Sequence, residues 1–290
     1  MELFEAASMI SGGMQVALKN KKGFLVGRNG TIEMETILTR FFQNTFYQQK
    51  LLILEKHAGV FPGTAGSVQS WLAETIDSIR SCDLLVAGWY EPLAAPEKEL
   101  LKQLGKKGPF MPLRALEPYY VPQEYQWTRF LLWRKVAVVS SFANLAVQQT
   151  KKAREIWGDR ADSLLPEATY IPIQTGYSPV LAQGRAGWPE GVANWQEAVD
   201  SVVQKVLESE ADIVLIGCGG LSMPIGRKLK EAGKVCIIMG GAIQVLFGIK
   251  GNRWKDHSVI SRFWNDAWVY PPLDRTPLAA EQIEGGCYWS

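Results

Sequence analysis

The sequence contains few residues of the types that build metal clusters or disulfide frameworks. Its 290 residues include only two histidines and four cysteines. These residues are His57, His257, Cys82, Cys218, Cys236 and Cys287. The cysteines are far apart and show no CxxC spacing, so we expect neither a zinc site nor a disulfide framework. Reduced structural thiols in a cytoplasmic protein are the simpler interpretation.

The sequence also lacks an excess of charge and a long hydrophobic run. It has 31 basic and 29 acidic residues, and this balance does not favour a nucleic-acid partner. Glu2 and Glu5 lie where a signal peptide would carry positive charge. The uncharged run at 235–249 is too short to cross a bilayer core of about 30 Å, so we expect no transmembrane helix.

Residues 130–255 alternate between strand and helix patterns. Short β-branched or apolar runs predict buried strands, and amphipathic stretches predict helices. The predicted strands are 135–140, 212–217 and 235–239, and the predicted helices are 144–157, 195–207 and 222–232. Strands joined by helices through short connections indicate a parallel sheet. We therefore predict an α/β fold, with a Rossmann-like parallel sheet flanked by helices.

Residues 1–125 are less regular but contain similar units. The predicted elements are strands at 23–28 and 83–87 and helices at 31–47 and 68–80. Because strand and helix units recur throughout, we predict one domain over 1–290, with 109–124 as the only candidate boundary. In this interpretation 130–255 is the nucleotide-binding core, and 256–290 is a tail that packs on it.

Glycine-rich turns follow two of the predicted strands. Their glycines are Gly217, Gly219, Gly220, Gly240 and Gly241. Ligands of parallel sheets bind beyond the carboxyl ends of the strands, where free N–H groups and a helix dipole favour phosphate. A dinucleotide fingerprint would need glycine at Ser222 and an acid near Met239, so NAD is disfavoured. The alternative is a tightly packed turn without a ligand.

The segment GGAIQVLFGIKGNRW (240–254) interrupts an apolar stretch with Gln244 and closes with Lys250, Arg253 and Trp254. The two cations could neutralise a diphosphate, with the arginine acting as a bidentate donor. Trp254 could stack on a base or a sugar. The alternative is a solvated basic turn anchored by a packed tryptophan.

Two further candidates lie in the first half. In GRNGTIE (27–33), Arg28 and Glu33 flank a glycine turn that opens a helix. Glu33 could be catalytic or bind a metal, but an acid in the first turn also stabilises a helix. His57 lies in KHAGVFPGTAG, which we expect to be a loop whose glycines would let the backbone approach a ligand. A lone loop histidine is more often non-catalytic.

These segments, in this order, resemble the GT-D fold-like glycosyltransferase family, which is associated with bacterial surface polysaccharides. The matching segments are GRNGTIE, HAGVFP, WRKVAVVSSFANLAVQQ, DIVLIGCGG, GGAIQVLFGIKGNRW and IEGGCYW. The resemblance spans nearly the whole chain. It implies a Rossmann-like fold that binds a nucleoside-diphosphate sugar and transfers the sugar to a glycan or lipid-linked acceptor.

The family carries an Arg-Phe-Gly-Asp-Gly-Glu type motif whose two acids form an Asp-x-Glu metal site. Here Arg28, Gly30 and Glu33 match, but Thr31 stands at the Asp position. A lone carboxylate with a hydroxyl is a poor ligand set for Mg²⁺ or Mn²⁺. Either the metal is dispensable, or this subgroup has lost that chemistry.

The resemblance leads us to expect a cytoplasmic glycosyltransferase of polysaccharide assembly, compatible with peripheral membrane association. We expect Arg28 to stabilise the leaving diphosphate and Glu33 to act as general base or metal ligand. The residues expected to bind the nucleotide sugar are Gly30, Thr31, His57, Gly217, Gly219, Gly220, Gly240, Gly241, Gln244, Lys250, Arg253 and Trp254. The alternative function is a non-catalytic nucleotide- or glycan-binding protein that regulates such a pathway.

Overall fold

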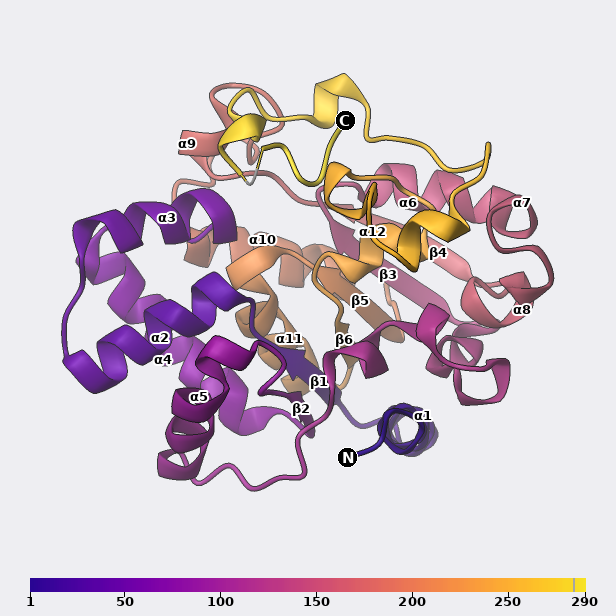
Figure 1. Ribbon diagram of the computed structural model, residues 1–290, viewed down its shortest axis with the longest axis horizontal. Helices are drawn as coiled ribbons and strands as arrows, with labels where there is room; N and C mark the ends of the chain where they lie inside the picture. Colours follow the sequence, from indigo (N-terminus) through magenta and orange to yellow (C-terminus); the bar gives the residue numbers. More distant parts are fainter. Residues whose placement is uncertain (284) are drawn as a thin grey trace.

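A computed structural model describes residues 1–283 and 285–290. Six parallel strands form one sheet in the order β2-β1-β6-β5-β3-β4 (Figure 1). The strands are β1 (Phe24–Arg28), β2 (Leu84–Val86), β3 (Lys135–Ser140), β4 (Thr169–Gln174), β5 (Ile213–Gly217) and β6 (Val235–Ile238). The predicted α/β class and the parallel sheet flanked by helices are confirmed.

Helices pack on both faces of this sheet (Figure 1). One face is covered by α2 (Thr31–Gln43), α3 (Gln48–Ala58), α4 (Ala65–Ser81), α5 (Glu91–Gln103), α10 (Trp195–Glu208) and α11 (Ser222–Glu231). The other is covered by α1 (Leu3–Asn20), α6 (Ala143–Gln149), α7 (Ala153–Trp157), α8 (Ala161–Leu164), α9 (Pro179–Ala182), α12 (Ala242–Leu246) and the C-terminal tail.

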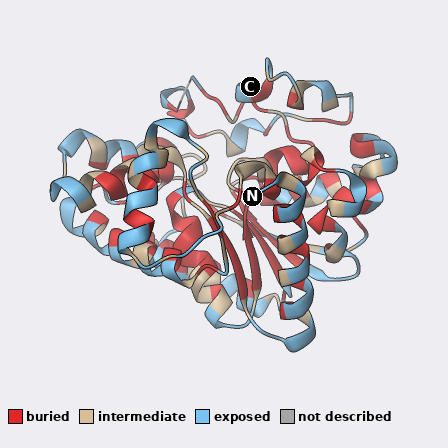
Figure 2. Cartoon of the chain, turned by 60° about the horizontal axis from the view of Figure 1, so that its bottom comes forward, coloured by how far each residue is buried: buried red, intermediate tan, exposed pale blue. Residues whose placement is uncertain are grey.

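The inner strands β1, β3, β5 and β6 are buried on both faces, because their successive side chains point to opposite sides and each side is covered by helices. In β5, Val214 and Ile216 pack toward α10 and α11, whereas Ile213 and Leu215 pack into the opposite layer. Figure 2 shows buried strands between helices whose outer surfaces are exposed. Double burial explains why these strands appear in the sequence as continuous apolar runs rather than as alternating patterns.

Two predicted helices differ in extent from the observed ones. The predicted helix at 144–157 is divided into α6 and α7 by a 3₁₀ turn, Thr150–Lys152. Side chains on either side of this turn, Gln149 and Trp157, donate hydrogen bonds to main-chain oxygens within 246–267, so tertiary contacts fix the segment. The predicted helix at 31–47 ends at Gln43, because Asn44 adopts the left-handed conformation that terminates helices.

Strand β4 was not predicted, because the stretch at 165–191 resembles a loop rich in proline and glycine. The strand contains Pro172 and pairs only with β3, at the edge of the sheet. Proline has no main-chain N–H group to donate to a second neighbouring strand, so it is disfavoured in a central strand but tolerated at an edge. Helices α1, α3 and α5 were also not predicted.

Strands from the first and second halves share one sheet, because β1 pairs with β6 on one side and with β2 on the other. The candidate boundary at 109–124 contains 3₁₀ turns, of which Leu113–Leu116 and Pro118–Tyr120 are the first two. Over residues 1–283 and 285–290, none of the helices combines the length and the apolar character needed to cross a membrane.

Candidate functional site

A cavity of about 440 Å³ lies beyond the carboxyl ends of the strands. After β5 the chain continues to β6, which lies on the side of β5 nearer to β2. After β3 it continues to β4, at the opposite edge of the sheet. Since β5 and β3 are neighbours, their connections diverge and open a crevice between them, which is where ligands of such sheets bind. The volume is in the range of small-molecule sites.

The turn after β5 lines this cavity, and its glycines are also required by packing. Gly219 has φ +51°, and a Cβ there would lie 2.6 Å from the carbonyl oxygen of Ala58. A Cβ at Gly220 would lie 2.8 Å from the side chain of Val60. Among the described residues the N–H groups of Gly219 and Gly220 have no acceptor. The packed-turn interpretation and the anion-binding interpretation therefore both remain compatible with this turn.

The turn after β6 packs against charged side chains instead. Gly240 has φ +58°, and a Cβ there would lie 2.3 Å from Nη1 of Arg28. A Cβ at Gly241 would lie 3.5 Å from Nη1 of Arg253. The N–H groups of Gly241 and Ala242 have no acceptor within 1–283 and 285–290. Two guanidinium groups and unpaired amides therefore converge on this turn.

Arg28 ends β1 and extends into the cavity, with its Cζ 5.4 Å from the ring centroid of Trp89. Glu33 is buried in the first turn of α2, and its carboxylate turns back over Gly30, the residue before the helix. Burial raises the pKa of Glu33, while the Arg28 guanidinium and the Glu33 main-chain N–H partly offset that rise. The same side chain thus lies in the first turn of a helix, as the alternative interpretation expects, and also lines the cavity.

The surroundings of Glu33 do not fit a divalent metal site. In the described part of the chain, no group of three His, Cys, Asp or Glu residues could hold a metal ion. Thr31 supplies only a hydroxyl, and the neighbouring Arg28 already carries a positive charge. A hard cation requires several charged or carbonyl oxygens, which an Asp-x-Glu pair would help to supply.

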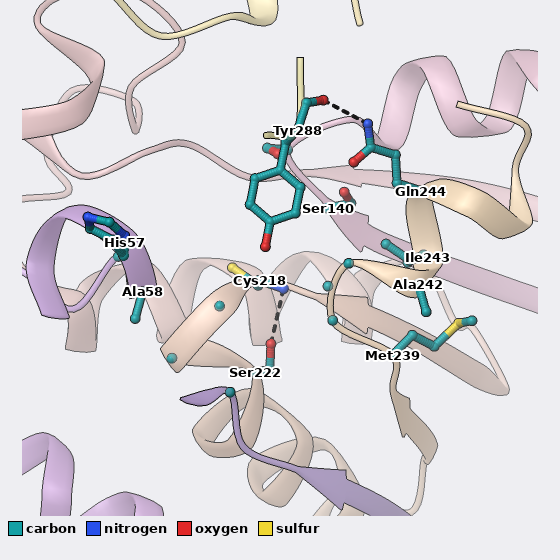
Figure 3. A pocket seen from close by; sticks show the side chains of 18 of the residues that line it. His57, Ala58, Ser140, Cys218, Ser222, Met239, Ala242, Ile243, Gln244 and Tyr288 are labelled. Atoms are coloured by element: carbon teal, nitrogen blue, oxygen red, sulfur yellow. Dashed lines mark hydrogen bonds between the residues drawn. The ribbon is translucent and has the colours of Figure 1, made fainter. Parts of the chain in front are cut away.

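Arg253 and Gln244 are held by the C-terminal tail. The Nη1 group of Arg253 donates a hydrogen bond of 2.8 Å to the hydroxyl of Tyr288. The Nε2 group of Gln244 donates to the main-chain oxygens of Lys250 and Tyr288, each at 2.8 Å. Figure 3 shows the second of these bonds. Gln244 is 2% exposed, so its amide fastens the tail to α12. Both residues line the cavity.

Lys250 is not brought together with Arg253. Its ammonium lies 5.6 Å from the ring centroid of Trp264 and 5.8 Å from that of Tyr270, and it does not line the cavity. Trp254 lines the cavity but is 8% exposed, in keeping with the anchor interpretation. All the other residues predicted to bind the nucleotide sugar line this one cavity.

His57 was predicted to lie in the loop KHAGVFPGTAG (56–66), but it lies in the last turn of α3, which ends at Ala58. Figure 3 shows His57 and Ala58 on one side of the cavity and Ala242 and Ile243 on the other, with the β5 turn between them. The cavity thus separates α3 from α12, two helices on opposite faces of the sheet.

The tail contributes cavity residues that were not among the predicted site residues. Ile283, Tyr288 and Trp289 line the cavity, and Figure 3 shows the Tyr288 ring projecting into it. Trp289 is 2% exposed and packs edge-on against Phe142 and Tyr177, with centroids 6.4 and 5.6 Å apart. The aromatic ending of IEGGCYW is the only sequence signal for this role.

A second group missed in the sequence follows β3 and β4 and consists mainly of hydroxyl-bearing residues. We call residues 140–142 and 175–178 the hydroxyl wall. Cys218 from the β5 turn adjoins it, and burial raises the pKa of its thiol to about 12. A thiol with such a pKa stays neutral, so it is not a nucleophile at neutral pH.

Searches against family models, curated proteins and solved structures found no match to this chain.

Proposed function

We propose that this protein is a glycosyltransferase that uses a nucleoside-diphosphate sugar in the biosynthesis of a cell-surface or capsular polysaccharide. One observation carries the proposal: Arg28, Arg253 and the unpaired amides of two glycine turns line a single cavity beyond the strand ends. Such a set of donors matches the negative charge of a diphosphate. The acceptor would be a glycan or a lipid-linked sugar, reached in the cytoplasm or at a membrane surface.

In this mechanism the acceptor oxygen bonds to the anomeric carbon while the bond from that carbon to the diphosphate oxygen breaks. The two guanidinium groups and the amides of the turns stabilise the charge that develops on the leaving diphosphate. Glu33 accepts the proton of the acceptor hydroxyl. Burial raises the pKa of Glu33 toward neutral pH, and a general base is most effective when its pKa lies near the working pH.

The binding part of the proposal is tested by Arg253→Ala. Loss of a charged hydrogen-bond donor should weaken the binding of uridine or guanosine diphosphate sugars about 10- to 100-fold by calorimetry. Arg262→Ala is the matched control, since Arg262 lies outside the cavity in the neighbouring 3₁₀ turn Ile260–Phe263. If the two variants bind the sugar nucleotides with equal affinity, Arg253 does not take part in binding.

A non-catalytic protein that binds a nucleotide or glycan and regulates such a pathway is the second candidate. It is favoured by Thr31 and by the poor metal-ligand set around Glu33. The two candidates differ in turnover: an enzyme should release sugar slowly from its donor, and Glu33→Gln should lower that rate at least about 100-fold without loss of binding. Binding with no sugar release in the unaltered protein would support the regulatory candidate.

A further inference from the structure

The charged residues of the cavity are unevenly distributed around it. Those that line it are Arg28, Glu33, Lys56, His57, Arg114, Glu117, Arg253 and His257. They come from the β1–α2 turn, from α3, from the turn at Leu113–Leu116 and its neighbour, and from the segment after α12. The hydroxyl wall contributes no acid, no cation and no histidine. The residues that follow β3 and β4 are therefore polar but neutral, whereas Arg28 and Glu33 follow β1, which β6 and β5 separate from β3 in the sheet.

Two hydroxyl groups of this wall are hydrogen-bonded to each other, and others have donors or acceptors left to use. The Tyr177 hydroxyl donates to Oγ of Ser141 at 2.8 Å. Oγ of Ser140 accepts the N–H of Phe142 at 3.2 Å, which leaves its own proton for another acceptor. The hydroxyl of Ser178 is buried and has no hydrogen-bond partner among the residues that the structure describes. The wall can thus exchange hydrogen bonds with a ligand that carries hydroxyls.

The wall is held in place from behind. Arg275, in the 3₁₀ turn Leu273–Arg275, donates to the main-chain oxygens of Thr175 at 2.8 Å and of Ser141 at 3.4 Å. Arg275 does not line the cavity, and its hydrogen bonds join the two loops. A wall fixed in this way binds a ligand with little loss of conformational freedom.

Aromatic rings complete this side of the cavity. Trp188 lines it and stacks with Phe61 at a centroid distance of 6.4 Å, and the ring of Tyr177 also lines it. A sugar ring offers hydroxyls at its edge and apolar C–H groups on its faces. Hydroxyl groups beside aromatic rings match both features.

We infer that the hydroxyl wall is the subsite of the transferred sugar and that this sugar is an uncharged hexose, with the diphosphate beside Arg28 and Arg253. The inference rests on the proposed function and deepens it by naming the class of donor. A hexuronate would bring a carboxylate against a wall from which no cationic side chain lines the cavity, because Arg275 lies outside the lining and its guanidinium donates to the main-chain oxygens of Ser141 and Thr175. Burying an unpaired carboxylate is costly, so the wall selects against it.

The test compares ligands that share one nucleotide. Calorimetry with UDP, UDP-glucose, UDP-galactose and UDP-glucuronate, and with GDP and GDP-mannose, should find a neutral sugar nucleotide bound at least about tenfold more tightly than the glucuronate. Preference for UDP-glucuronate, or equal affinity for a nucleoside diphosphate and all its sugars, would overturn the inference and leave the proposed function standing. A protein that binds none of these ligands would refute both.

Variants of the wall separate the sugar from the nucleotide. Tyr177→Phe and Ser141→Ala should each weaken the neutral sugar nucleotide about fivefold and leave the nucleoside diphosphate unchanged. Tyr170→Phe is the matched control, because Tyr170 lies on β4 outside the cavity and donates to the main-chain oxygen of Pro166. Equal weakening of both ligands, or none in either wall variant, would contradict the sugar subsite.

Discussion

The turns after β5 and β6 both carry paired glycines at the end of a buried strand, yet they pack against different partners. After β5, a Cβ at Gly219 would meet the main-chain oxygen of Ala58, which cannot move without shifting α3. After β6, a Cβ at Gly240 would meet the tip of the Arg28 side chain, which can move. The comparison shows that glycines in similar turns can preserve the fold in one place and position a site residue in the other.

The largest expected effect is on stability, in Gly219→Ala. The left-handed backbone and the close contact with Ala58 should together cost roughly 2–4 kcal/mol, which lowers Tm by about 5–10 °C in calorimetric unfolding. Gly66→Ala is the control, since Gly66 lies in α4 with open space around its Cα. If the two variants unfold at the same temperature, the packing role of the β5 turn is wrong.

Gly240→Ala should separate stability from binding. Its strained backbone should cost about 1 kcal/mol, and displacement of Arg28 should weaken nucleotide binding about tenfold. Gly105→Ala provides a control with similar strain, because Gly105 has φ +70° and no atom near a Cβ, far from the cavity. If calorimetry finds the same nucleotide affinity in Gly240→Ala as in the unaltered protein, the β6 turn does not position Arg28 for binding, and the proposed difference between the two turns is wrong.

A smaller effect is expected in the pH dependence of stability on the β6 side, where Glu33 faces Arg28. Because its pKa is raised in the folded protein, the charged form is disfavoured there; the associated stability is present below the ordinary pKa of 4.5 and lost as pH rises. Glu33→Gln should therefore raise Tm at pH 8 and leave it unchanged near pH 4. The exposed Glu99, changed to Gln, should show no such trend.

The smallest effect is expected in Lys250→Ala. Loss of its contacts with the rings of Trp264 and Tyr270 should cost at most about 1 kcal/mol of stability, and nucleotide affinity should stay within about twofold of that of the unaltered protein. Weakening comparable to that of Arg253→Ala would show that Lys250 reaches the ligand after all.

The buried central strands could be predicted from the sequence, because the apolar runs that form them are local features of the chain. The runs that became β3, β5 and β6 are continuous and apolar, so burial on both faces was evident from composition alone. Strand β4 gave no such signal, because Pro172 breaks the pattern and only its edge position makes that proline acceptable. The C-terminal cap of α2 at Asn44 was a local signal that the predicted boundary did not use.

The sequence by itself determined the parallel α/β sheet, the glycine turns at its strand ends and a part of the cavity lining, since every predicted site residue except Lys250 lines it. Only the tertiary structure decided that Lys250 lies outside, that Tyr288 projects inward and that the hydroxyl wall lines the same cavity as Arg28 and Arg253. The reason is physical. Periodicity and turn chemistry depend on neighbours along the chain, whereas a cavity is composed by the strand order and by contacts between segments more than a hundred residues apart.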